Sequence, residues 1–63
     1  MILLTKLDGH TIAVNDVLIV FAESTPDTVV TMSSGQRILV REPVAELIER
    51  VLAFRRSTGA QHG

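Results

Sequence analysis

The spacing of apolar and polar residues divides the chain into a strand-like part and a helix-like part. Short apolar segments rich in β-branched residues predict strands within 1–7, 10–14, 17–24, 28–32 and 36–41. After Pro43, apolar residues at 44, 47, 48, 51, 52 and 54 follow the 3.6-residue period of a helix over 44–56. We therefore expect a mostly β fold, with about five antiparallel strands in a curled sheet or small SH3-like barrel, plus one C-terminal helix.

Turn-forming residues stand between these segments. They are Asp8–Gly9, Asn15–Asp16, Thr25–Pro26–Asp27 and Ser33–Ser34–Gly35. The dipeptide Asp8–Gly9 predicts a two-residue type I′ hairpin turn, in which both central residues take a positive φ. Each strand is thus expected to reverse into the next.

The 63 residues are enough for one domain. We expect it to span residues 1–56, and we expect residues 57–63, "STGAQHG", to form a flexible tail because they offer nothing to bury.

Size and composition together favour self-association. A chain this short buries a small core and usually needs a further stabilising device. The chain has no cysteine for a disulfide, yet 46% of its residues are hydrophobic. We predict a homo-oligomer, or a monomer that docks on a larger partner.

The apolar residues also exceed what one sheet face needs. Leu18, Val20 and Ala22 alternate with Ile19 and Phe21, so both faces of this segment are apolar. The helix can cover one face. If the sheet closes into a barrel, its interior takes the other, and no surplus is left; otherwise the second face is a contact site.

No residue pattern points to catalysis or to a bound cofactor. The histidines, His10 and His62, are far apart in the sequence, and turn chemistry accounts for Ser33 and Ser34. Glu42, Glu46 and Glu49 surround a helix start, where the dipole and solvent explain them. We expect no enzyme activity, no metal and no cofactor.

Charge and hydropathy predict a location away from nucleic acid and lipid. The formal net charge is −1, and no apolar run reaches the roughly 18 residues of a membrane span. The N-terminus lacks the basic start of a signal peptide. Lys6, Arg37 and Arg41 could gather on one sheet face, but single-stranded RNA usually needs more aromatic platforms than Phe21 and Phe54. We expect a cytoplasmic protein with no nucleic-acid partner and no direct membrane insertion.

Several segments together resemble a known family. They are "MILLTKLDG" at 1–9, Asn15, "LI" at 18–19, Glu23, "TPDTVVT" at 25–31, Gly35, and the helix start with Val44, Glu46 and Ile48. Over residues 1 to about 54 the chain closely resembles the FlbD-like flagellar proteins, which include the SwrD-type swarming motility proteins. This resemblance implies a small cytoplasmic protein linked to flagellar motor output, with recruitment to the membrane at the motor.

The chain departs from the family pattern at a few positions. Lys6 and Asp8 stand where Arg and Asn are common, and Pro43 replaces a more ordinary helix starter. Val20 and Phe21 stand where more polar residues are common, which implies a more adhesive sheet in this member.

A second resemblance covers a shorter segment. "LLTKLDGHTIAV" at 3–14 and the strands-then-helix order are similar to the carbon storage regulator family of dimeric RNA-binding proteins. The similarity fades after the first hairpin, and the basic C-terminal elements of that family are missing. It implies the alternative function of a small RNA-binding translational regulator.

The combined interpretation is a non-catalytic accessory protein of flagellar motility that acts by protein–protein contact, with the motor stator as partner. The candidate contact residues are Val20, Phe21, Val29, Thr25, Pro26, Asp27, Leu39, Arg50 and Phe54. The first three are expected to mediate self-association, and the "STPD" turn at 24–27 and the helix are expected to face the motor.

Overall fold

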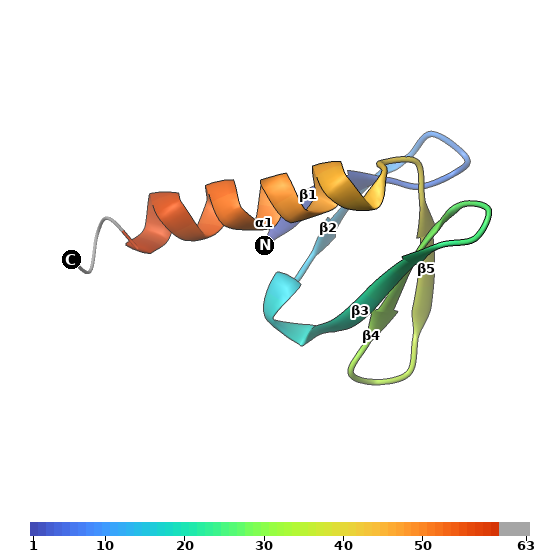
Figure 1. Ribbon diagram of the computed structural model, residues 1–63, viewed down its shortest axis with the longest axis horizontal. Helices are drawn as coiled ribbons and strands as arrows, with labels where there is room; N and C mark the ends of the chain where they lie inside the picture. Colours follow the sequence, from blue (N-terminus) through green and yellow to red (C-terminus); the bar gives the residue numbers. More distant parts are fainter. Residues whose placement is uncertain (60–63) are drawn as a thin grey trace.

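The computed structural model describes residues 1–59, which form five strands, one short 3₁₀ helix and one α-helix (Figure 1). Their order is β1 (Ile2–Thr5), β2 (Thr11–Val14), η1 (Asp16–Leu18), β3 (Ile19–Ser24), β4 (Thr28–Met32), β5 (Arg37–Val40) and α1 (Val44–Gly59). The expected mostly β class with one C-terminal helix is confirmed.

Strands β1 and β2 form an antiparallel hairpin with one buried face. Ile2 pairs with Val14 and Leu4 with Ile12, so alternate residues point into the core. The predicted type I′ turn is wrong. Gly9 has a φ of 97°, whereas no non-glycine residue of the described chain has a positive φ, and the Lys6 N–H donates to the His10 carbonyl (2.8 Å). The loop therefore holds three residues, and only its last position needs the left-handed conformation.

Strands β3, β4 and β5 form a three-stranded antiparallel sheet in that order. The β3–β4 connection contains a cis peptide bond between Thr25 and Pro26. The β4–β5 connection repeats the geometry of the first hairpin: Met32 N–H donates to the Gln36 carbonyl (2.8 Å), and Gly35 takes a φ of 90°. Two turns of one type thus depend on a glycine at the same loop position.

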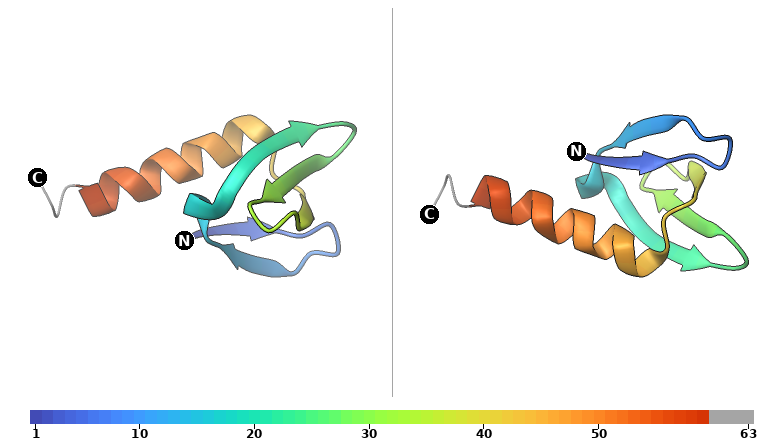
Figure 2. Two further views of the ribbon diagram at one scale, coloured as in Figure 1. Left: turned by 90° about the horizontal axis from the view of Figure 1, so that it is seen from below. Right: turned by 90° about the horizontal axis from the view of Figure 1, so that it is seen from above.

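The two sheets meet at one edge without closing into a barrel. An isolated antiparallel bridge joins Lys6 to Val40, and the Arg41 N–H donates to the Thr5 carbonyl (2.7 Å). At the other side, the chain passes from β2 through η1 into β3, where the Asn15 side chain accepts from the Val17 N–H (3.2 Å). Figure 2 shows the hairpin and the larger sheet as two halves of an open barrel.

Helix α1 packs on β1 and β3 through its first half. Leu47 is buried and Val51 is half-buried against the core, while the C-terminal half extends past both sheets (Figures 1 and 2). The helix ends at Gly59, three residues beyond the predicted boundary at 56. Of the expected tail, residues 60–63 lie outside the described part of the chain.

The core lies where the hairpin, the inner face of the larger sheet and the helix meet. Its buried hydrophobic residues are Ile2, Leu4, Val14, Val30, Ile38, Val40 and Leu47. With the helix and the hairpin on the inner face, the opposite face of the β3–β4–β5 sheet has no covering layer among residues 1–59.

Candidate protein-contact surface

The uncovered face of the larger sheet is built by strand pairing. In β4, Val30 points into the core, so its neighbours Val29 and Thr31 point outward. Pairing places Phe21 and Arg37 on either side of Thr31, and Glu23 and Leu39 on either side of Val29. We call this set the outer sheet face: Phe21, Glu23, Val29, Thr31, Arg37 and Leu39.

Large apolar side chains on and beside this face are open to solvent. Phe21 is 46% exposed and Leu39 is 43% exposed, while Val29 between them is half-buried. Val20 is 61% exposed because the β3–β4 register shifts between Ile19 and Phe21, which makes Val20 an extra, unpaired residue. Of the two alternatives for this segment, the structure has the open sheet, and apolar side chains of the segment stay exposed among residues 1–59.

A polar atom at the centre of the outer sheet face lacks a partner. Thr31 Oγ1 is buried and makes no hydrogen bond within the described residues. Buried hydroxyls are normally paired, because an unmet hydrogen bond costs about 1–3 kcal/mol. The side chains around Thr31 thus cover its hydroxyl without satisfying it.

The candidate turn residues Thr25, Pro26 and Asp27 are exposed, and Pro26 and Asp27 border a concavity. A shallow pocket of about 340 Å³ lies between this turn, Leu7 and Pro43. The Arg41 guanidinium lines the pocket and donates to the Leu7 carbonyl from Nε (3.1 Å) and Nη2 (2.8 Å), which holds the β1–β2 loop in place. The turn therefore borders a groove whose other side, the β1–β2 loop, is held in place by Arg41.

The helix candidates Arg50 and Phe54 do not line this groove. Arg50 donates to the Leu3 carbonyl (2.7 Å), to Glu42 (3.1 Å) and to Glu46 (2.9 Å). These bonds give Arg50 a role in docking the helix on β1. Phe54 is about one third exposed on the projecting half of the helix. Their roles in partner contact stay predictions.

Sequence reasoning missed two buried carboxylates that hold the fold together. Glu42 accepts the Thr5 N–H at both oxygens (2.8 and 3.0 Å) and also binds Arg50. Burial acts to raise the pKa of Glu42, but the bonds from Thr5 and the charge of Arg50 outweigh it and lower that pKa below its ordinary value. A glutamate directly before the proline that precedes a helix was the available signal.

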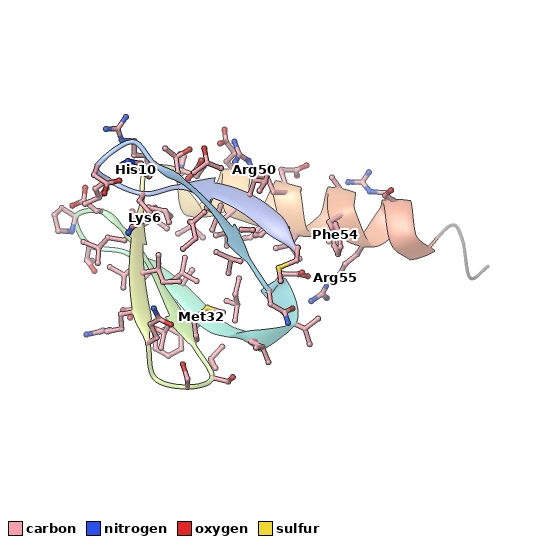
Figure 3. The ribbon with its side chains drawn as sticks, turned by 180° about the vertical axis from the view of Figure 1, so that it is seen from behind. Lys6, His10, Met32, Arg50, Phe54 and Arg55 are labelled. Atoms are coloured by element: carbon pink, nitrogen blue, oxygen red, sulfur yellow. The ribbon has the colours of Figure 1, made fainter. Side chains whose placement is uncertain are left out.

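Asp16 plays the same part at the other end of the helix. Its carboxylate is buried and accepts from the Met1 ammonium (3.1 Å) and from Arg55 Nε (3.4 Å), which reaches toward η1 in Figure 3. Burial acts to raise the pKa of Asp16, yet the ammonium, its backbone bond and Arg55 lower it overall. The sequence predicted only a turn at this residue.

The comparison with known families decides the wider assignment. The model of the family described as "FlbD: Flagellar and Swarming motility proteins" matches residues 1–59. The chain belongs to the FlbD family. No curated protein and no solved structure matches it.

Membership of the FlbD family gives this protein a role in flagellar and swarming motility. The FlbD description names motility and not a reaction. Among residues 1–59, no group of three or more His, Asp or Glu side chains is placed to hold a metal ion. Also within that range, no helix is long and apolar enough to cross a membrane.

The cations weighed for RNA binding are divided in this FlbD protein. Lys6 and Arg37 line one shallow pocket together with Asp8, whereas Arg41 lines the pocket at the 25–27 turn and is bonded to Leu7. The three cations therefore line two different pockets, and the pocket that Lys6 and Arg37 share also contains a carboxylate.

Proposed function

We propose that this FlbD protein is a non-catalytic accessory protein of flagellar motility that acts by protein–protein contact on the motor stator. The observation that carries the proposal is the outer sheet face. Its apolar residues Phe21 and Leu39, with Val20 beside them, are exposed to solvent. Exposed apolar clusters on small soluble domains commonly mark contact sites.

Two surfaces divide the work in this proposal. The outer sheet face and Val20 serve self-association. The groove bordered by Pro26, Asp27 and Pro43 is presented to the stator, because it is concave and because Arg41 holds the neighbouring β1–β2 loop in place. A concave site with a few fixed polar groups suits recognition of a protruding protein segment.

Location follows from the partner. The protein works in the cytoplasm and is recruited to the membrane at the motor through its stator contact. The C-terminal half of α1 points away from the β3–β4 connection, so it leaves the groove accessible (Figure 1).

Photo-crosslinking in flagellated cells tests the stator contact. A crosslinking amino acid is placed at Asp27 and, as a matched control, at Ser34, which is also an exposed turn residue but belongs to the β4–β5 connection. We expect a crosslink to a stator subunit from position 27 and none from position 34. Equal crosslinking from both positions, or none to the stator from position 27 in motile cells, contradicts the proposal.

A further inference from the structure

The outer sheet face has its apolar and charged residues on opposite diagonals. Strand pairing gives two rows, Phe21–Thr31–Arg37 and Glu23–Val29–Leu39. Phe21 and Leu39 are therefore diagonal corners, and so are Glu23 and Arg37. Both charged side chains are exposed, and neither takes part in an ion pair among residues 1–59.

We propose that a second copy of this chain packs face to face on the outer sheet face, with the two-fold axis along the Phe21–Leu39 diagonal. This inference rests on the self-association surface of the proposed function and names its occupant and geometry. A rotation about that diagonal brings Phe21 and Leu39 against their own counterparts. It also brings each Glu23 near Arg37 of the second copy, so two ion pairs form at once.

The other symmetric arrangements match the face less well. An axis along β4 places Glu23 on Leu39 of the second copy, and an axis across the strands places Phe21 on Glu23 and Arg37 on Leu39. An axis along the charged diagonal brings Glu23 against Glu23 and Arg37 against Arg37. Association is opposed where like charges face each other, and also where a charged side chain faces an apolar side chain of the second copy. The chosen axis alone pairs each charge with its opposite.

The resulting geometry is one that protein sheets adopt. The two corners are two strands apart, about 10 Å, and two residues apart along the strand, about 7 Å. The diagonal thus lies about 55° from the strands, and the strands of the two copies cross at about 70°. This angle is close to the orthogonal class of sheet packing, which centres near 90°.

The size of the face sets the expected strength. Three strands about 4.8 Å apart, over four residues, form a face of roughly 14 by 14 Å. Each face covers about 200 Å² in projection, so the two faces together cover about 400 Å², well below the roughly 1,200 Å² of a standard specific interface. We therefore expect a weak, reversible dimer that forms at high-micromolar to millimolar concentrations.

Charge reversal in the intact protein tests the pairing. Sedimentation velocity of the unaltered chain should show a rise from 6.9 kDa toward twice that mass as the concentration approaches the millimolar range. Glu23→Arg alone and Arg37→Glu alone should each weaken the dimer at least about tenfold, because each variant faces two repulsive contacts. An equimolar mixture of the two variants should restore association, since a mixed dimer contains two attractive pairs. Such rescue between different molecules cannot come from refolding within one chain.

Two control variants separate this face from the helix. Glu49→Arg reverses an exposed charge on α1, and Leu52→Asp alters an apolar residue whose 47% exposure equals that of Phe21 within one percentage point. Both should dimerise as the unaltered chain does. A monomer at all concentrations, single variants that dimerise normally, or a mixture that associates no better than its components overturns the inference.

Motility separates this outcome from the proposed function. If the unaltered chain stays monomeric but Phe21→Asp abolishes swarming, another protein occupies the face, and the dimer is wrong while the contact function stands. If the mixture restores the dimer and Phe21→Asp still swarms, the dimer is right and its part in motility is wrong.

Discussion

Replacing Glu42 by glutamine should destabilise the protein far more than the same change at Glu46. Both carboxylates bind Arg50, at 3.1 and 2.9 Å, but Glu42 is 6% exposed whereas the Glu46 side chain is 50% exposed. Glutamine keeps the size of Glu42 and one acceptor for the Thr5 N–H. It removes the negative charge that binds Arg50. It also places the glutamine NH2 group, a hydrogen-bond donor, next to the Thr5 N–H and the Arg50 guanidinium, which are donors as well.

The magnitude follows from the bonds that change. A hydrogen bond to a charged group is worth about 1.5–3 kcal/mol, and Arg50 can recover part of this from water because it is partly exposed. We therefore expect a loss of about 2 kcal/mol for Glu42→Gln. An exposed pair four residues apart on a helix contributes about 0.3–0.5 kcal/mol, which is the expected loss for Glu46→Gln. For a domain of this size, 1 kcal/mol lowers Tm by about 4–8 °C.

Thermal unfolding followed by circular dichroism measures both effects, and acid adds a second test. The pKa values of Glu42 and Asp16 are lowered in the folded state, so their stabilisation is present above the ordinary values of 4.5 and 3.8 and is lost as pH falls through the folded values. The Tm gap between the unaltered chain and Glu42→Gln should thus be largest at neutral pH and shrink in acid. Equal losses for Glu42→Gln and Glu46→Gln, or a gap unchanged in acid, would refute this account of helix docking.

Three further changes test other features by thermal unfolding. Thr31→Val removes the unpaired buried hydroxyl while keeping a β-branched shape, and it should stabilise the protein by about 1 kcal/mol; a lower Tm would show that Oγ1 has a partner. Gly35→Ala should destabilise it by about 1–2 kcal/mol, because φ is 90° there although no atom lies within 4 Å of the added Cβ; an unchanged Tm would contradict the left-handed turn. Phe21→Asp, at an exposed position, should change the Tm of the monomer by less than about 4 °C; a large drop would place Phe21 in the core.

The elements of the fold could be predicted because they depend on local patterns. The alternation of apolar and polar residues in 37–40 predicts a strand, which is β5. The 3.6-residue period after Pro43 predicts a helix, which is α1. The first turn shows where this stops. Asp8–Gly9 suits a type I′ turn by composition, but the pairing of Lys6 with His10 adds one residue to the loop and leaves the positive φ to Gly9 alone.

The residues that fix the tertiary arrangement could not be predicted because their partners are distant in the sequence. Glu42 binds the backbone of Thr5 across 37 positions, and Asp16 meets Arg55 across 39. Spacing along the chain carries no sign of either contact, and both acids read as ordinary turn or helix-start residues. Arg50 shows the same limit, since Glu46 is a local neighbour four residues away on the helix, whereas the Leu3 carbonyl that Arg50 also binds is 47 positions away.

The candidate contact surface was predicted in part. The surplus of apolar residues in 17–24 and at Val29 indicated that the sheet has a second apolar face, and the exposure of Val20 and Phe21 fits this. Closure into a barrel would have hidden that face. Closure depends on how the first hairpin pairs with β5, and the structure joins the two by the isolated bridge between Lys6 and Val40. The β3 bulge that turns Val20 out also depends on pairing with β4 and not on the local sequence.

The most direct test of the contact function is swarm expansion in cells whose only copy of this protein carries Phe21→Asp, expressed at the native level and shown to be folded. The account predicts a swarming defect as severe as loss of the protein, with normal swarming for the matched Val17→Asp change at another exposed apolar position. Normal swarming of the Phe21→Asp cells would contradict the claim that the outer sheet face carries the function.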